Sequence, residues 1–271
     1  MAPRLGELWA VACKFDRRFS YFTYVPYAYD SIEYKLPLLV AVHGSDRFPE
    51  TVRSQYRYFA EAYGCVVLAP YFPDGALQDD GQDEHYKYIE FKGVRFDNIL
   101  LDMVDQVCQS YKKVDGNKFL LYGFSGGGQF SHRFAYIHPD RLLALGIGAP
   151  GTVTLADKGL PFPGGISDLE SRFGVNFDQF KRANLPILAI VGENDIESIA
   201  HLYNASRNIP KEHFTTRTEV MKRLLKSLDD WNVSYQYKMI AGASHEDDRM
   251  VGSVYRFFGS VLEELNREVN S

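Results

Sequence analysis

Cysteine is scarce in this chain, and its spacing excludes the usual cysteine-based architectures. The 271 residues include three cysteines, Cys13, Cys65 and Cys108, and none of them forms a C-x-x-C pair. Such scattered residues support neither a disulfide framework nor a zinc or thioredoxin-type site. Since all three occur in apolar surroundings, we expect small buried thiols.

Long hydrophobic runs and blocks of one charge are also absent. No stretch approaches the roughly 18 consecutive apolar residues of a membrane span, and residues 1–8 contain no signal-peptide core. The formal net charge is −5 and no run of five like charges occurs, so the chain has no electrostatic footprint for nucleic acid. These absences predict a soluble, cytoplasmic protein with neither a membrane span nor a nucleic-acid partner.

Motifs that bind phosphates, dinucleotides or metals are missing as well. The sequence has no G-x-x-x-x-G-K-[ST], the glycines at 123–128 lack the G-x-G-x-x-G spacing, and there is no H-E-x-x-H. We therefore expect a protein that uses no cofactor and no metal.

The chain does have the composition of a globular protein and a regular alternation of elements. Hydrophobic residues make up 45% and charged residues 24%. Apolar runs alternate with segments of helical periodicity, which predicts an α/β fold: a mostly parallel sheet with helices on both faces. We expect strands at 37–43, 65–69 (ended by Pro70), 118–122, 142–147, 187–191 and 234–240, and helices at 50–63, 96–111, 126–137, 215–228 and from 250 onward.

The remaining segments complete a single predicted domain over residues 1–271. The β-rich runs 8–13 and 19–25 are joined by polar residues and predict an N-terminal antiparallel hairpin. Segments 71–95 and 151–184 are long and lack clear periodicity. Since loops of this length are usually functional, and both follow strands, we expect them to form the rim or lid of an active site.

The sharpest chemical signal is Gly123-Phe124-Ser125-Gly126-Gly127, between a predicted strand and a predicted helix. This is the context that the G-x-S-x-G nucleophile motif requires. The flanking glycines are expected because a Cβ atom there would crowd the neighbouring strand and helix. Ser125 is thus the candidate nucleophile, and Phe124 either supports the turn or contacts substrate.

A serine nucleophile needs a base, and the base needs a carboxylate that orients it. His245 follows the last predicted strand, at the sheet edge where sites of parallel sheets lie. Asp195 is on the turn after the strand 187–191 and is the favoured carboxylate. Glu193 and Glu197 on the same turn are the alternatives.

Acyl transfer also requires donors for the oxyanion. We expect one from the backbone N–H of Gly126 and the other from that of Ser45, with Asp46 as the alternative, in the turn after the strand 37–43. His43, at the start of that turn, is expected to brace the loop.

These features together resemble the α/β-hydrolase superfamily, in its esterase/lipase-like branch. The resemblance runs from about residue 36 to the C-terminus and includes G-F-S-G-G, the H-G turn, P-I-L-A-I-V-G-E-N-D and G-x-x-H, in the order Ser125, Asp195, His245. It implies an eight-stranded, mostly parallel sheet and a serine nucleophile. Ser45 and Asp46 stand where the HGGG oxyanion motif of some relatives has glycines.

The leading hypothesis is hydrolysis of a carboxylic ester, lactone or thioester by a Ser-His-Asp triad through an acyl-enzyme. The alternatives are acyl transfer, cyclisation or C–C hydrolysis by the same triad, and a non-catalytic small-molecule receptor. Aromatic residues in the two long segments suggest a small-molecule substrate with an apolar or aromatic portion, although they could equally pack the loops down. Asp46, Phe124 and Tyr71 are the candidate substrate contacts, and the sequence predicts no oligomeric state.

Overall fold

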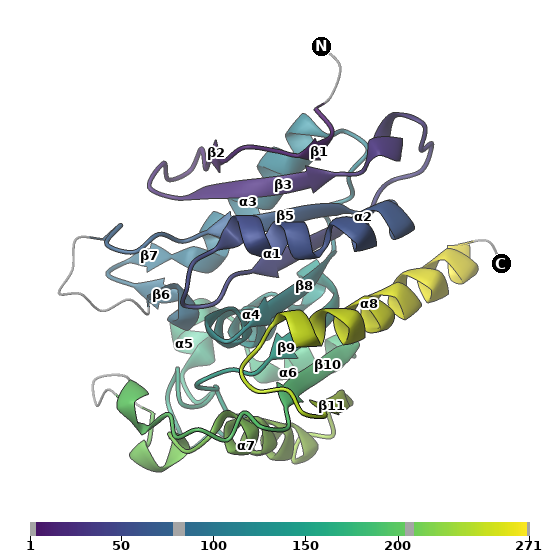
Figure 1. The fold of residues 1–271 in the computed structure, drawn as a ribbon. Coiled ribbons are helices and arrows are strands. Elements are labelled where there is room, and N and C mark those ends of the chain that lie inside the picture. The colour runs from purple at the N-terminus through teal and green to yellow at the C-terminus, as the bar shows by residue number, and fades with distance from the viewer. Residues whose placement is uncertain (1–3, 78–84, 204–208, 270–271) are drawn as a thin grey trace.

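A single large sheet organises the computed structural model, which describes residues 4–77, 85–203 and 209–269 (Figure 1). Its strand order is β1-β3-β5-β4-β8-β9-β10-β11, and β2 pairs with β3. From β5 to β11 all neighbours are parallel, whereas β3 is antiparallel to β1, β2 and β5. The strands are β1 (Gly6–Glu7), β2 (Val11–Ala12), β3 (Ser20–Val25), β4 (Leu38–Val42), β5 (Val66–Tyr71), β8 (Phe119–Phe124), β9 (Leu142–Gly148), β10 (Ile187–Gly192) and β11 (Gln236–Ile240). The mostly parallel sheet and the N-terminal hairpin are confirmed.

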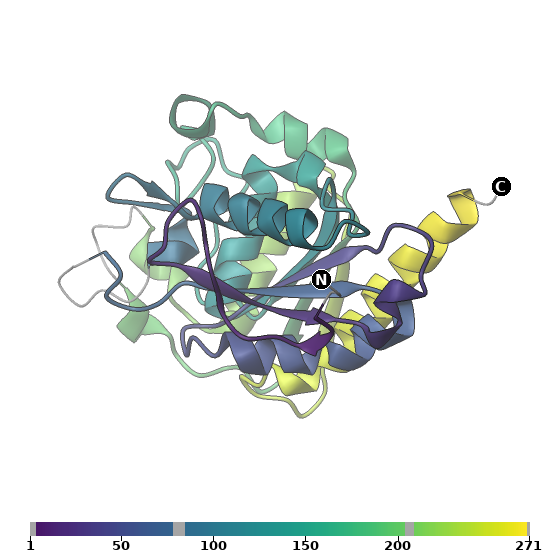
Figure 2. The same ribbon diagram turned by 90° about the horizontal axis from the view of Figure 1, so that it is seen from above.

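Helices cover both faces of this sheet, and Figure 2 shows α1, α2 and α8 on one face and α3 and α4 on the other. The helices are α1 (Pro49–Gln55), α2 (Arg57–Tyr63), α3 (Phe96–Ser110), α4 (Gly126–Ile137), α5 (Leu169–Phe173), α6 (Phe177–Ala183), α7 (Arg217–Asp229) and α8 (Asp248–Val269). In the part of the chain that the structure describes, no helix is both long and apolar enough to cross a membrane.

Strand β4 shows why the central strands are continuously apolar. Its alternate residues face two separate cores: Val40 packs with side chains of α3 and α4, and Leu39 packs with side chains of α1, α2 and α8. Because successive side chains point to opposite faces, a strand covered on both sides has no polar position. Burial of apolar side chains on both faces therefore stabilises β4, β8 and β10, whose carboxyl ends lie at one edge of the sheet.

Two expected boundaries are wrong. The helix expected over 50–63 is two helices, because Tyr56, which is fully buried, makes an i to i−3 hydrogen bond to Arg53 that ends α1. The strand expected to end at Pro70 continues to Tyr71. Pro70 has no N–H to donate to a neighbouring strand. The pairing of β4 with β5 ends at Leu68, before the proline, so no hydrogen bond between these two strands is lost.

The segments predicted as rim contain short elements of their own. Segment 71–95 holds the 3₁₀ turn η2 (His85–Tyr88) and the small hairpin β6 (Glu90–Phe91) and β7 (Val94–Arg95), and its residues 78–84 lie outside the described part. Segment 151–184 holds α5 and α6. A third long connection, 193–216, was not expected; it contains η4 (Ala200–Leu202) and η6 (Lys211–His213), and residues 204–208 are not described.

Candidate active site

Ser125 lies on a tight turn between β8 and α4. Its backbone φ of 53° falls in the left-handed region that side chains other than glycine rarely adopt. The turn is held because the Ser125 N–H donates to the carbonyl of Gly148 at 2.8 Å. A Cβ atom at Gly123 would overlap the backbone of Gly127, and one at Gly127 would overlap the carbonyl of Val42. The two glycines therefore let strand and helix approach closely enough to form the turn.

The three side chains singled out by the sequence lie in one hydrogen-bonded chain. His245 Nε2 is 3.0 Å from Ser125 Oγ, and His245 Nδ1 is 2.7 Å from Asp195 Oδ2. Since a carboxylate can only accept, Nδ1 carries the proton and Nε2 is free to accept the serine hydroxyl. Asp195 is 2% exposed, so this carboxylate is held away from bulk water.

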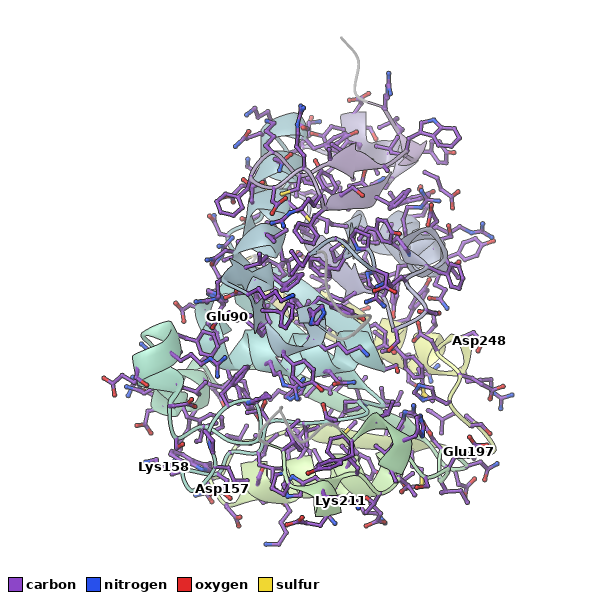
Figure 3. The ribbon with its side chains drawn as sticks, turned by 90° about the vertical axis from the view of Figure 1, so that its left-hand side faces the viewer. Glu90, Asp157, Lys158, Glu197, Lys211 and Asp248 are labelled. Carbon is purple, nitrogen blue, oxygen red and sulfur yellow. The ribbon has the colours of Figure 1, made fainter. Side chains whose placement is uncertain are left out.

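The turns after β10 and β11 are tied to each other, which fixes Asp195 relative to His245. Glu193 Oε2 accepts from the Gly242 N–H at 2.9 Å, and the Asn194 N–H donates to the Ala243 carbonyl at 2.8 Å. Glu193, one alternative carboxylate, thus supports the backbone of the histidine turn. Glu197, the other alternative, is exposed and lies at the periphery (Figure 3).

Arg217, the first residue of α7, also belongs to this arrangement. Its Nη1 donates to Asp195 Oδ1 at 3.3 Å, so that each carboxylate oxygen has its own partner. From the sequence alone, only the start of a helix could be predicted here, because Thr216 is a favourable N-cap residue. In the structure its side chain accepts a hydrogen bond from the Glu219 N–H. That Arg217 reaches Asp195 depends on how α7 packs against β10.

The two predicted oxyanion donors lie near each other beside Ser125. Gly126 opens the 12-residue helix α4, so its N–H has no acceptor within the helix and lies at the positive end of the helix dipole. A Cβ atom on Gly126 would be 3.2 Å from the backbone nitrogen of Ser45. The backbone nitrogen of Ser45 therefore lies close to Gly126.

His43 braces the loop that carries Ser45, in the way the sequence suggested. Its Nε2 accepts from the Phe72 N–H at 3.1 Å, so Nδ1 holds the proton and donates to the Gly44 carbonyl at 2.7 Å. Tyr86 adds a hydrogen bond of 2.9 Å from its hydroxyl to the same carbonyl. Complete burial lowers the pKa of His43 to about 4, which keeps the ring neutral.

A cavity of about 430 Å³ opens over Ser125 and His245. Besides Ser45, Thr51, Ser125 and His245, its polar side chains form two groups, which come from opposite faces of the sheet. The donor side comprises Lys87 of η2, Gln129 of α4 and Arg217 of α7. The acceptor side comprises Asp46 of the loop before α1, Gln55 of α1 and Asp247 before α8. The apolar side chains of the lining are Phe48, Val52, Phe124 and Leu202.

Asp247 has the most perturbed carboxyl group of the cavity. Burial raises its pKa to about 6, although the Tyr122 hydroxyl, which donates to Oδ1 at 2.8 Å, opposes that rise. Sequence reasoning missed this residue, whose only signal is a carboxylate two positions after His245. Gln55 Oε1 is also buried here and accepts no hydrogen bond from any described residue.

The predicted substrate contacts divide between cavity and core. Asp46 and Phe124 line the cavity, and the Phe124 ring lies 4.7 Å from the His245 ring, centroid to centroid. Tyr71 does not line it; its ring lies edge-on to that of His43 at 6.2 Å. Four other aromatic side chains of the two long segments are buried and pack the loops down: Phe72, Tyr86, Tyr88 and Phe162.

No protein-family model matches the sequence, and no curated protein sequence matches it. Solved structures do resemble it. A poly(3-hydroxybutyrate) depolymerase from Bordetella parapertussis has a TM-score of 0.74 at 20% identity, over 94% of this chain and 90% of that protein. Poly(aspartic acid) hydrolase-1 from Sphingomonas sp. KT-1 has a TM-score of 0.73 at 19% identity, over 94% and 98%.

An S-formylglutathione hydrolase from Agrobacterium tumefaciens is similar over 97% of both chains, with a TM-score of 0.65 at 14% identity. These likenesses, together with the strand order, define the architecture. The protein has the α/β-hydrolase fold.

Proposed function

We propose that this protein is a serine hydrolase that cleaves a carboxylic ester, a lactone or a thioester. The observation that carries the proposal is the hydrogen-bonded chain from Ser125 through His245 to Asp195, beside two backbone donors at the carboxyl edge of the sheet. The names of the three similar proteins, a depolymerase and two hydrolases, agree with this class of reaction.

Acylation begins when Ser125 Oγ attacks the substrate carbonyl carbon and His245 Nε2 takes the hydroxyl proton. Asp195 holds the imidazole in the productive tautomer and stabilises the imidazolium. The carbonyl oxygen becomes an oxyanion, to which the N–H groups of Gly126 and Ser45 donate. Collapse of this intermediate breaks the ester C–O bond, and the imidazolium gives its proton to the leaving alcohol.

Deacylation repeats the steps of acylation with water in place of the serine hydroxyl. His245 removes a proton from water, the hydroxide attacks the acyl carbon, and Ser125 leaves with the proton that His245 returns. No redox or metal step is required by this cycle. Arg217, by holding the second oxygen of Asp195, acts as a positioning residue for the imidazole.

The substrate is proposed to be a small molecule with an apolar or aromatic portion. Because His245 protonates the leaving oxygen, the alcohol lies toward the His245 turn, and Phe48 and Val52 of the α1 region offer it an apolar surface. The single domain over 1–271, the rim or lid role of 71–95 and 151–184, and the cytoplasmic location stay predictions.

A fluorophosphonate probe and a panel of acyl esters, lactones and thioesters test the proposal. We expect the probe to label Ser125 in the folded wild-type protein, to leave the Ser125→Ala variant unlabelled, and at least one member of the panel to be hydrolysed. A folded protein that ignores the probe while it binds small molecules would instead be a receptor. Formation of a new ester or a C–C cleavage product would assign one of the alternative reactions.

A further inference from the structure

Gln129 is a buried amide at the cavity that the proposed reaction does not use. It is 4% exposed, lines the cavity, and lies one helical turn after Ser125 on α4. Because side chains on a helix lean toward its N-terminus, the amide lies toward the end of α4 that carries the nucleophile. A buried side chain in this position contacts whatever molecule fills the cavity beside Ser125.

The hydrogen bonds around Gln129 determine which end of its amide faces the cavity. Arg133 Nη2, which can only donate, contacts Thr152 Oγ1 at 3.1 Å. The Thr152 hydroxyl in turn donates to Gln129 Oε1 at 2.6 Å. Nε2 then remains at the cavity wall, and it donates to no acceptor among the described residues.

Gly151 lies beside this amide and has no side chain that would crowd it. A Cβ atom at Gly151 would lie 3.2 Å from Gln129 Nε2 and 3.3 Å from Leu202 Cδ1. The donor is thus oriented by buried neighbours, has no acceptor among the described residues, and borders a glycine that places no side chain against it. Such a donor is satisfied by water in the empty cavity, and by an acceptor on the substrate when the cavity is filled.

The position of Gln129 assigns it to the acyl half of the substrate. The leaving alcohol lies toward His245, whose turn leads into α8, whereas α4 and η2 cover the opposite face of the sheet. Lys87 marks the same side, since its Cε would be 2.9 Å from a Cβ atom on the oxyanion residue Gly126. Arg133 fastens η2 to α4 through a 2.8 Å hydrogen bond from Nη1 to the Lys87 carbonyl.

Resting on the proposed function, we propose that Gln129 Nε2 hydrogen-bonds an acceptor oxygen on the acyl group of the substrate. The site then selects acyl groups that carry a carboxylate or a second carbonyl oxygen over hydrocarbon groups of the same shape. The physical reason is desolvation, because a hydrocarbon chain would displace water from Nε2 and leave a buried donor unsatisfied.

The test compares three ethyl esters whose acyl chains have the same length and end in a carboxylate, a carboxamide or an isopropyl group. We expect kcat/KM of the wild-type protein to be roughly 10- to 100-fold higher for the two oxygen-bearing esters. If only the carboxylate is favoured, the acceptor is anionic; if both are favoured alike, a neutral carbonyl suffices. Equal or better turnover of the isopropyl ester would overturn the inference.

Two variants of the same residue make the test specific. Gln129→Leu should lower kcat/KM roughly tenfold for the oxygen-bearing esters and leave the isopropyl ester within about threefold. Gln129→Glu still accepts from Thr152 but presents a carboxylate oxygen to the cavity, so it should disfavour the carboxylate-bearing ester most. An unchanged ratio among the three esters in both folded variants contradicts the proposed contact.

Gln55→Leu is the matched control, because Gln55 lines the cavity from the acceptor side. It should leave the ratio among the three acyl groups unchanged. Failure of the inference and failure of the proposed function are distinguishable with the fluorophosphonate probe. A protein that is labelled and hydrolyses only the isopropyl ester keeps the proposed function and loses the acyl contact; a folded protein that is not labelled loses both.

Discussion

The two sides of the cavity differ in the kind of group they present and in how that group is held. On the donor side, Gln129 is oriented through Thr152 by the fully buried Arg133, and Arg217 is held by Asp195. On the acceptor side, Asp247 is held by Tyr122, while Gln55 Oε1 accepts from no described residue. The lining of the cavity is therefore asymmetric about Ser125.

This asymmetry arises from the two layers of helices. The donors come from η2, α4 and α7, and the acceptors come from the region of α1 and α8 on the opposite face. Ser125 lies between them, at the end of the central strand β8. Ser125, Asp195 and His245 thus lie on short turns at the sheet edge, and the flanking layers supply most of the other polar side chains of the cavity.

The largest effect on activity is expected from removal of the Ser125 hydroxyl, which lies between the donor side and the acceptor side of the cavity. Ser125→Ala should lower kcat for the best ester by something like 10³–10⁶, because no acyl-enzyme can form. Ser171→Ala, on the exposed face of α5, serves as the control and should retain wild-type turnover. Near-normal kcat in folded Ser125→Ala would rule out the covalent mechanism.

A change on the donor side should have the next largest effect. Arg217→Met leaves Asp195 Oδ1 without its partner, so we expect kcat/KM to fall by roughly 10- to 100-fold through loss of imidazole orientation. Arg217→Lys should restore part of that loss, since the ammonium keeps the charge but not the planar geometry. Steady-state kinetics with Arg223→Met as the control on the same helix would show whether the effect belongs to the contact with Asp195.

A change on the acceptor side should appear in stability as a function of pH. The pKa of Asp247 is raised to about 6 in the folded protein, above its ordinary value of 3.8, so between these values the folded state binds more protons than the unfolded state. Wild-type stability from this group is therefore present at low pH and is lost as pH rises through that window. Asp247→Asn should remove the dependence and gain about 3 kcal/mol over the wild type at pH 7.

Denaturant unfolding of both proteins at pH 4 and pH 7 measures this difference. Asparagine keeps an oxygen for the Tyr122 hydroxyl, which limits other changes. A stability gap between wild type and variant that does not grow from pH 4 to pH 7 would show that the Asp247 carboxyl is not perturbed.

The smallest effect is expected from Gly151→Ala. The added methyl group would press on Gln129 Nε2 at 3.2 Å and on Leu202 at 3.3 Å, so either neighbour has to give by a few tenths of an ångström. We expect the preference for oxygen-bearing acyl groups to fall by about threefold, with the melting temperature nearly unchanged. A similar loss for every ester would instead indicate a general narrowing of the cavity.

The turns of the site could be predicted because each is required by local geometry. Gly123 and Gly127 are necessary for the close approach of β8 and α4, an apolar run marks β10, whose end carries Asp195, and the segment 234–240 predicts the strand before His245. Parallel strands with right-handed crossovers then bring those ends to one edge. The end of α1 at Tyr56 was missed because it depends on the burial of the Tyr56 ring. The extension of β5 past Pro70 was missed because it depends on β3, and not β4, being the strand that pairs with β5 there.

The amino-acid sequence by itself determined the layered architecture and the order of Ser125, Asp195 and His245, since both follow from hydrophobic periodicity and backbone sterics within a few residues. Only the tertiary structure decided that Arg217 reaches Asp195, that the loop aromatics turn inward, and that Gln129 presents its nitrogen to the cavity. The physical reason is that each of these depends on hydrogen bonds or packing between segments distant in the chain, such as the contact of Arg133 with Thr152.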